Sequence, residues 1–245
     1  MIPDILAIAQ KEWRELLRQD VDRKGLALRL ALFAIAAVTL ARTAGPDFGA
    51  SWATVLLIPF LAAFAVLPVV TDTIAGERER QTLETLLASR IPDAALLLGK
   101  YLAHVAYGSA LALAVLVVGL VVAWVRYASS PLFEVRPLVL FATIGLTPIA
   151  AGLIAAAGIH VSLRAPTTKH ATQAMGLLFF AVAMVVVLLS QIELPPELAD
   201  RLDAMTPREP TAGMVFLAVV QGAVLDAVLV GLALPRFRRS RLILD

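Results

Sequence analysis

The sequence contains no cysteine, and only 16% of its 245 residues are charged. The absence of cysteine excludes disulfide bridges, thiolate metal sites and cysteine nucleophiles. A soluble domain carries about 25% charged residues, so the charge content is low for that class. Hydrophobic residues instead make up 60% of the chain, and the mean hydropathy is +0.84. This composition predicts an integral membrane protein.

The sequence also lacks the motifs of common enzyme classes. Its one Gly-Lys pair, Gly99-Lys100, is followed by Tyr101, and Ala94 stands where the first glycine of a phosphate-binding P-loop would be. There is no GxSxG motif. The histidines lack HExxH spacing and are expected to serve helix packing or interfaces: His104, His160 and His170. The chain is therefore predicted to be no enzyme and to bind no cofactor or metal.

Apolar residues are gathered in blocks long enough to cross a bilayer, which needs roughly 20 residues per helix. We predict an all-α polytopic membrane protein with a single transmembrane domain over residues 1–245. Its six predicted transmembrane helices are 26–41, 52–74, 101–125, 137–160, 171–191 and 212–234.

The basic residues predict the orientation. Of the 21 Lys and Arg residues, 15 fall in the termini and in the second and fourth connections, and 5 fall on the opposite side. Lys and Arg accumulate on the cytoplasmic side of membrane proteins. We therefore predict a multi-pass protein of the cytoplasmic (inner) membrane with both termini in the cytoplasm.

Two segments outside the spans are predicted to lie at the membrane surface. Residues 1–25 are amphipathic, with Ile2, Leu6 and Trp13 on one face and charges, including Glu12, on the other. This predicts an interfacial helix, either a plain anchor or one that also touches a cytoplasmic partner. Residues 192–211 predict a short external helix or a proline-rich loop.

The elbow, residues 71–100, places dense charge between two apolar spans. We expect Gly76 to end the second span and a helix to occupy 76–91, with Arg80 pairing with Glu77 and Glu84. An apolar stripe follows at Leu83, Leu86 and Leu87, and Pro92-Asp93 is expected to begin the helix that enters the third span. This pattern favours a docking surface; the alternative is a solvated connection.

The stretch from Asp72 onward, read as D-x-x-x-G-E-R-E-R-x-T-L-E-x-L-L, resembles the permease subunits of ABC transporters. More narrowly it resembles the type-2 exporter class, and the tail AIAQKEWRELLRQD resembles the connecting helix that opens such permeases. The resemblance covers nearly the whole chain. Gln81 departs from the pattern, where a small residue is usual.

The resemblance implies a dimer of six-helix halves, homo- or heterodimeric, on two ATPase subunits that bind ATP and Mg²⁺. It implies the lipid bilayer as surroundings and no nucleic-acid partner. The elbow would be the coupling helix that transmits closure of the ATPase. The matching positions are Glu77, Arg78, Glu79, Arg80, Thr82, Leu83 and Glu84.

Asp226 is an ionisable residue within the last predicted span. A carboxylate at that depth costs at least about 2.5 kcal/mol on insertion scales, so it is expected to face protein or water. Two interpretations stay open. Asp226 contacts substrate or gates the pathway, or it pairs with a basic residue on a neighbouring helix, for which Arg29 has the closest estimated depth.

These features together predict the permease of an ATP-driven exporter. The first alternative is a permease-like subunit whose ATPase drives assembly or maturation of another protein. The second is an energy-independent scaffold or channel. The substrate is not predicted by any feature of the sequence.

Overall fold

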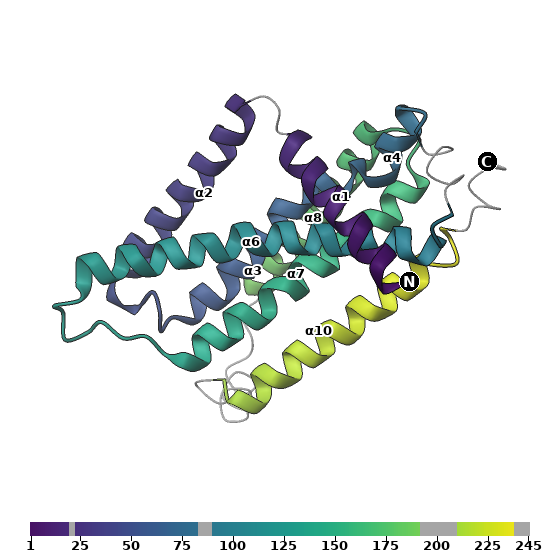
Figure 1. Ribbon diagram of the computed structural model, residues 1–245. Coiled ribbons are helices and arrows are strands. Elements are labelled where there is room, and N and C mark those ends of the chain that lie inside the picture. The colour runs from purple at the N-terminus through teal and green to yellow at the C-terminus, as the bar shows by residue number, and fades with distance from the viewer. Residues whose placement is uncertain (20–22, 83–89, 192–209, 238–245) are drawn as a thin grey trace.

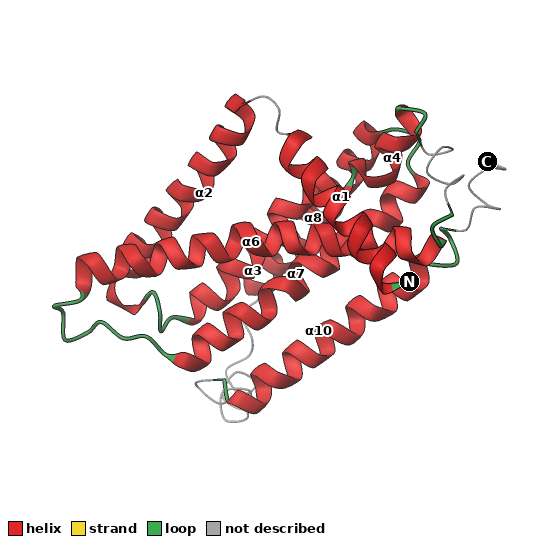
Figure 2. Ribbon diagram, viewed as in Figure 1, coloured by secondary structure: helices red, strands yellow, loops and turns green. Residues whose placement is uncertain are grey.

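The structure is a computed structural model that describes residues 1–19, 23–82, 90–191 and 210–237. Every regular element in these ranges is a helix (Figure 2), which confirms the predicted all-α class for them. The helices are α1 (Ile2–Gln19), α2 (Arg23–Ala44), the 3-10 helix η1 (Gly45–Asp47), α3 (Trp52–Val70), α4 (Asp72–Glu79), α6 (Asp93–Tyr127), α7 (Pro137–Arg164), α8 (Thr168–Ser190) and α10 (Ala212–Ala233).

Helices α3, α6 and α7 pack on one another and form the centre of the bundle. Helices α1 and α2 lie against α6, α10 lies against α7, and α8 contacts α3, α4 and α7 (Figure 1). The contact faces are rich in small buried residues, among them Ala62 on α3, Ala112 on α6 and Ala151 on α7. Small side chains let helix backbones approach closely, as is typical of membrane bundles.

Gly108 on α6 is the position where this close approach is tightest against backbone. A methyl group there would contact Val66 and lie 2.8 Å from the Ala62 carbonyl oxygen of α3. We expect Gly108→Ala to destabilise the protein by about 1–3 kcal/mol, because the helices must separate. Gly176→Ala on α8 is the matched control, since nothing lies within 4 Å of the added methyl. It is expected to be neutral or stabilising, and thermal unfolding in detergent compares the two.

Four of the six predicted transmembrane helices are supported by the length and composition of the helices in the structure. Four helical stretches are long and apolar enough to cross a membrane: Trp52–Glu79, Asp93–Tyr127, Pro137–Arg164 and Ala212–Ala233. Helices α2 and α8 coincide with the other two predicted spans in position, and their crossing of the membrane stays a prediction. The predicted external segment lies outside the described residues at 192–209.

The second predicted span does not end at Gly76, which lies inside α4. The helix is interrupted earlier, at Thr71, where Ser162 of α7 inserts its hydroxyl into the helical hydrogen-bond ladder. Ser162 Oγ donates to the Thr71 carbonyl over 3.0 Å and accepts from the amides of Ile74 and Ala75 over 3.1 and 2.9 Å. A side chain inserted in this way is a recognised cause of helix kinks.

The elbow lies at one end of the bundle. Helix α4, the beginning of α1, the beginning of α6 and the end of α10 are together at that end (Figure 1). As predicted, α6 begins at Asp93, directly after Pro92, and continues without interruption to Tyr127. Because proline disfavours helical conformation in the residue before it, the helix start is set locally.

Candidate functional site at the elbow

A buried lysine joins three helices at the elbow. Lys100, near the start of α6, is 2% exposed. Its Nζ donates to Glu12 Oε1 of α1 and to Glu77 Oε1 of α4, each over 2.8 Å, and to the Thr73 carbonyl over 3.2 Å. We call Lys100, Glu12 and Glu77 the Lys100 cluster. Each carboxylate neutralises the ammonium from a different helix, so α1, α4 and α6 are tied to one point.

The Lys100 ammonium favours the ionised form of Glu12 despite the burial of this carboxyl group. Burial by itself raises the pKa of Glu12, but the Lys100 ammonium outweighs it and holds this pKa below its usual value. A lowered pKa in the folded state means that pairing stabilises the fold at neutral pH. That contribution is lost as the pH falls below the usual range for glutamate, about 4. Glu77 Oε2 is buried without a hydrogen-bond partner.

Arg78 and Glu79, the next two charged residues of α4, form hydrogen bonds with the connection between α7 and α8. Arg78 donates to the Ala165 carbonyl over 2.6 Å and to the Leu163 carbonyl over 3.3 Å. Glu79 accepts from the Thr168 amide over 3.0 Å and from its hydroxyl over 2.8 Å. A cation at the end of α7 and an anion at the start of α8 both complement the helix dipoles. The elbow thereby supplies caps for two other helices.

Arg80 pairs with Asp72 across one side of α4, at 2.9 Å. Gly76 leaves room for this pair, because a methyl group at that position would contact Asp72 and lie 2.8 Å from Arg80 Nη2. The predicted pair between Glu77 and Arg80 is therefore wrong: Lys100 takes Glu77, and Asp72 takes Arg80. The other predicted partner, Glu84, lies outside the described residues, as does the leucine stripe from Leu83 onward.

The elbow lies inside a stretch that matches a known protein family. The family model described as "ABC-2 family transporter protein" matches residues 43–215, more than two thirds of the chain. The chain belongs to the ABC-2 transporter family. It is thus a permease-type membrane subunit of an ABC transporter, and membership implies association with an ABC ATPase. No curated protein matched the chain.

In this ABC-2 permease the charged elbow residues are largely engaged within the chain. Glu77 is buried, Arg78 is half-buried, and Glu79 binds the start of α8. These side chains were predicted to form a docking surface, and they also join α4 to its neighbours. The structural role of Lys100 was not predicted, and Glu12 was predicted to lie on the polar face of α1. The spacing of Ile8, Glu12 and Leu16, all buried on one face, is the signal that identifies it.

Two histidines of the permease serve helix packing, as predicted. His104 Nδ1 is 2.7 Å from the Lys100 carbonyl and its Nε2 is 3.2 Å from the Thr73 hydroxyl, so the ring lies directly beside the Lys100 cluster. His160 on α7 reaches α10, with Nε2 2.8 Å from the Leu229 carbonyl and Nδ1 3.0 Å from Arg236. His170 is exposed on α8.

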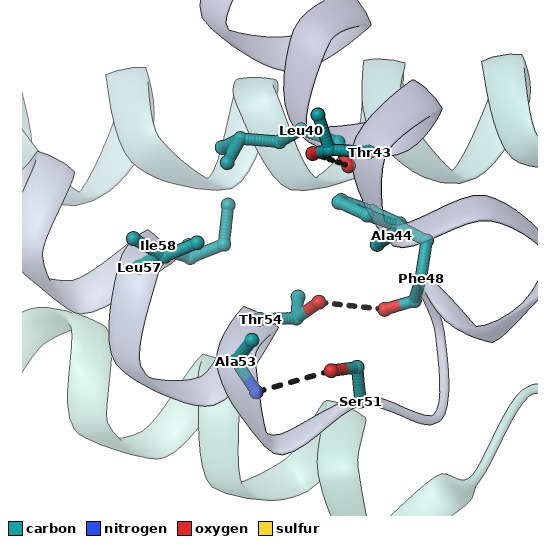
Figure 3. Close-up of a pocket in the computed structure, with 9 residues that line it drawn as sticks. All are labelled: Leu40, Thr43, Ala44, Phe48, Ser51, Ala53, Thr54, Leu57 and Ile58. Carbon is teal, nitrogen blue, oxygen red and sulfur yellow. Dashed lines mark hydrogen bonds between the residues drawn. The ribbon is translucent and has the colours of Figure 1, made fainter.

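Two of the cavities differ in size and in the polarity of their lining. A cavity of about 20 Å³ adjoins the Lys100 cluster, room for a single water molecule. A cavity of about 190 Å³ lies where α2 and α3 meet (Figure 3). No ionisable residue lines it, and its polar groups bond locally: Thr54 donates to the Phe48 carbonyl, and Ser51 Oγ accepts from the Ala53 amide. The cavity of about 190 Å³ therefore belongs to a structural turn.

Among the described residues, Asp226 is bonded to a residue of α6. The Tyr101 hydroxyl of α6 donates a hydrogen bond to its carboxylate. Helix α2, which carries Arg29, packs against α6, whereas α10 packs against α7, and the two helices lie on opposite sides of the bundle (Figure 1). The side chain of Arg29 itself lies outside the described residues, so its pairing with Asp226 stays a prediction.

Proposed function

We propose that this chain is the membrane-spanning subunit of an ATP-driven ABC exporter and forms the translocation pathway as a dimer. Two such six-span subunits, identical or different, would associate with two nucleotide-binding subunits at the cytoplasmic membrane. ATP and Mg²⁺ would bind to the partner ATPase, and this chain would hydrolyse nothing itself. Membership in the ABC-2 family supports the permease part of the proposal.

The main support for the proposal is the set of ion pairs that Lys100 forms with Glu12 and Glu77. A helix that only linked two spans would not need a buried ammonium shared with α1 and α4. Taking three charges out of water is costly unless they are well paired. The cluster fixes α1, α4 and α6 relative to one another at the elbow. A displacement of α4 would therefore move α1 and α6 with it.

A second set of contacts connects the elbow to the rest of the bundle. Arg78 and Glu79 bind the α7–α8 connection, and Ser162 of α7 bonds the start of α4. Closure of the ATPases against the elbow would then tilt α6, α7 and α8 together. Rigid-body movement of this kind is a standard route to alternating access.

The proposed orientation places the elbow and both termini in the cytoplasm. It is supported by the 15 to 5 distribution of basic residues and by the position of α1, α4 and the end of α10 at one end of the bundle. Helix α1 would lie in the membrane interface. Its exposed apolar side chains, Ile2, Leu6 and Leu17, support this position.

Purification of the tagged chain from its native host in mild detergent tests the proposal. Mass spectrometry is expected to find a stoichiometric P-loop ATPase. Reversing charge on the elbow with Arg80→Glu and Glu84→Lys is expected to lower its recovery by about tenfold or more, since opposed charges at an interface become like charges. Arg126→Glu, an exposed position at the opposite end of α6, is the control and should leave recovery unchanged.

Each other outcome selects a different function. Recovery of the chain without an ATPase, even after cross-linking, would contradict the proposal and leave a scaffold or passive channel. An ATPase together with a maturation factor from the far side of the membrane would favour a role in assembly of another protein. Equal loss of ATPase in the Arg126→Glu control would show that the elbow is not the contact.

A further inference from the structure

A buried carboxylate with a free oxygen lies between α6, α7 and α10. Asp226 is 8% exposed and is the single ionisable residue of α10, whose other residues are almost all apolar. One oxygen accepts the hydrogen bond from the Tyr101 hydroxyl of α6. The other, Oδ1, is buried and has no hydrogen-bond partner. The group is thus held in place on one side and unsatisfied on the other.

The pairing of Asp226 with Tyr101 depends on a glycine of the third helix. A methyl group at Gly152 of α7 would contact Asp226 Oδ2 and lie 2.5 Å from the Tyr101 hydroxyl oxygen. Any larger residue would push the carboxylate and the phenol out of this position. Three helices therefore contribute one residue each, Tyr101 as donor, Asp226 as acceptor and Gly152 as the space between them.

Neither protonation state of Asp226 satisfies its second oxygen. An ionised carboxylate needs a donor at Oδ1, and a protonated one needs an acceptor or a further donor there. No Lys, Arg or His of the described residues forms an ion pair with Asp226. Buried polar groups in native proteins are nearly always bonded, and an acidic residue within a membrane helix usually marks a functional site. The described residues thus offer no partner for Oδ1, and a transported molecule can supply one.

We propose that Asp226 binds a cationic group with N–H donors on the transported molecule, with Tyr101 and Gly152 as positioning residues. This inference rests on the proposed transport function. A permanent positive charge neutralises the carboxylate, and an N–H bond satisfies Oδ1. Tyr101 directly follows Lys100 in α6, so a shift of the Lys100 cluster displaces the donor that aligns Asp226. Substrate contact and elbow are therefore connected through two adjacent residues.

Fluorescence titration of the purified complex in lipid nanodiscs tests the inference. Ethidium, a permanent cation with amino groups, is the probe, and N-phenyl-1-naphthylamine, an uncharged apolar dye, is the comparison. Asp226→Asn keeps the size of the side chain and an acceptor for Tyr101 but removes the charge. It is expected to raise the Kd of ethidium by about tenfold or more, because a hydrogen bond to a charged group is lost. Binding of the naphthylamine should not change.

Further variants separate a binding role from a structural one. Tyr101→Phe is expected to raise the Kd of ethidium by a smaller factor, since the carboxylate remains but is no longer aligned. Gln221→Ala removes an exposed polar group from the same helix and should change nothing. No binding of ethidium to the unmodified complex, or equal binding to Asp226→Asn, would overturn the inference. Co-purification of the ATPase, measured on the same samples, reports separately on the proposed function.

Discussion

Replacing Lys100 with methionine is expected to destabilise the protein by about 3–5 kcal/mol, the cost of breaking a buried ion pair by removing one partner. Methionine preserves the length of the side chain but leaves Glu12 and Glu77 facing each other without the buried cation that lies between them. Both carboxylates lie 2.8 Å from the ammonium in the intact protein, so their mutual repulsion is added to their desolvation. The folded bundle should survive poorly in detergent.

Thermal unfolding and the monodisperse fraction on size-exclusion chromatography measure this effect. Lys169→Met on α8 is the control, because Lys169 is exposed. Substitution at a surface position of this kind usually changes the stability by no more than about 0.5 kcal/mol. The triple variant Lys100→Met, Glu12→Gln, Glu77→Gln should recover most of the loss, since no buried charge remains. Equal stability of Lys100→Met and Lys169→Met would show that the Lys100 cluster does not stabilise the bundle.

Removal of the Ser162 hydroxyl by Ser162→Ala is expected to have the second largest effect. The amides of Ile74 and Ala75 lie in buried residues, 1% and 0% exposed, and both donate to Ser162 Oγ. A buried donor left without a partner costs about 1–3 kcal/mol. The chain recovers part of this cost only if α4 straightens onto α3 and restores the Ala75 to Thr71 bond. Either way the elbow is displaced.

Hydrogen exchange at Ile74 and Ala75, together with thermal unfolding, distinguishes these responses. Faster exchange shows that the amides have lost protection, whereas slow exchange with altered ATPase recovery shows a straightened helix. Ser130→Ala is the control: Ser130 Oγ accepts from the Leu132 amide over 3.2 Å at an exposed turn, where water replaces the lost acceptor. Unchanged exchange and stability in Ser162→Ala would mean that the hydroxyl does not cause the interruption at Thr71.

Gly76 and Pro92 show which helix ends can be predicted from neighbouring residues and which cannot. The start of α6 after Pro92 was predicted correctly, because proline restricts its own backbone and that of the preceding residue. Gly76 was predicted to end a helix by the same kind of local rule, and it lies inside α4. Its small size is needed for the Asp72–Arg80 pair, which is a packing requirement. A glycine in a sequence does not reveal which of these two roles it has.

By itself the sequence determined the class of the protein, its helices and its family. These features rest on apolar blocks, basic flanks and a charged motif, all of which act over short stretches of chain. The tertiary structure decided what the charges do. Lys100 meets Glu12 from 88 residues away, and Ser162 meets Thr71 from 91 residues away. Partners so distant are selected by helix packing, because only the folded bundle removes water and leaves each buried group a single place to bond.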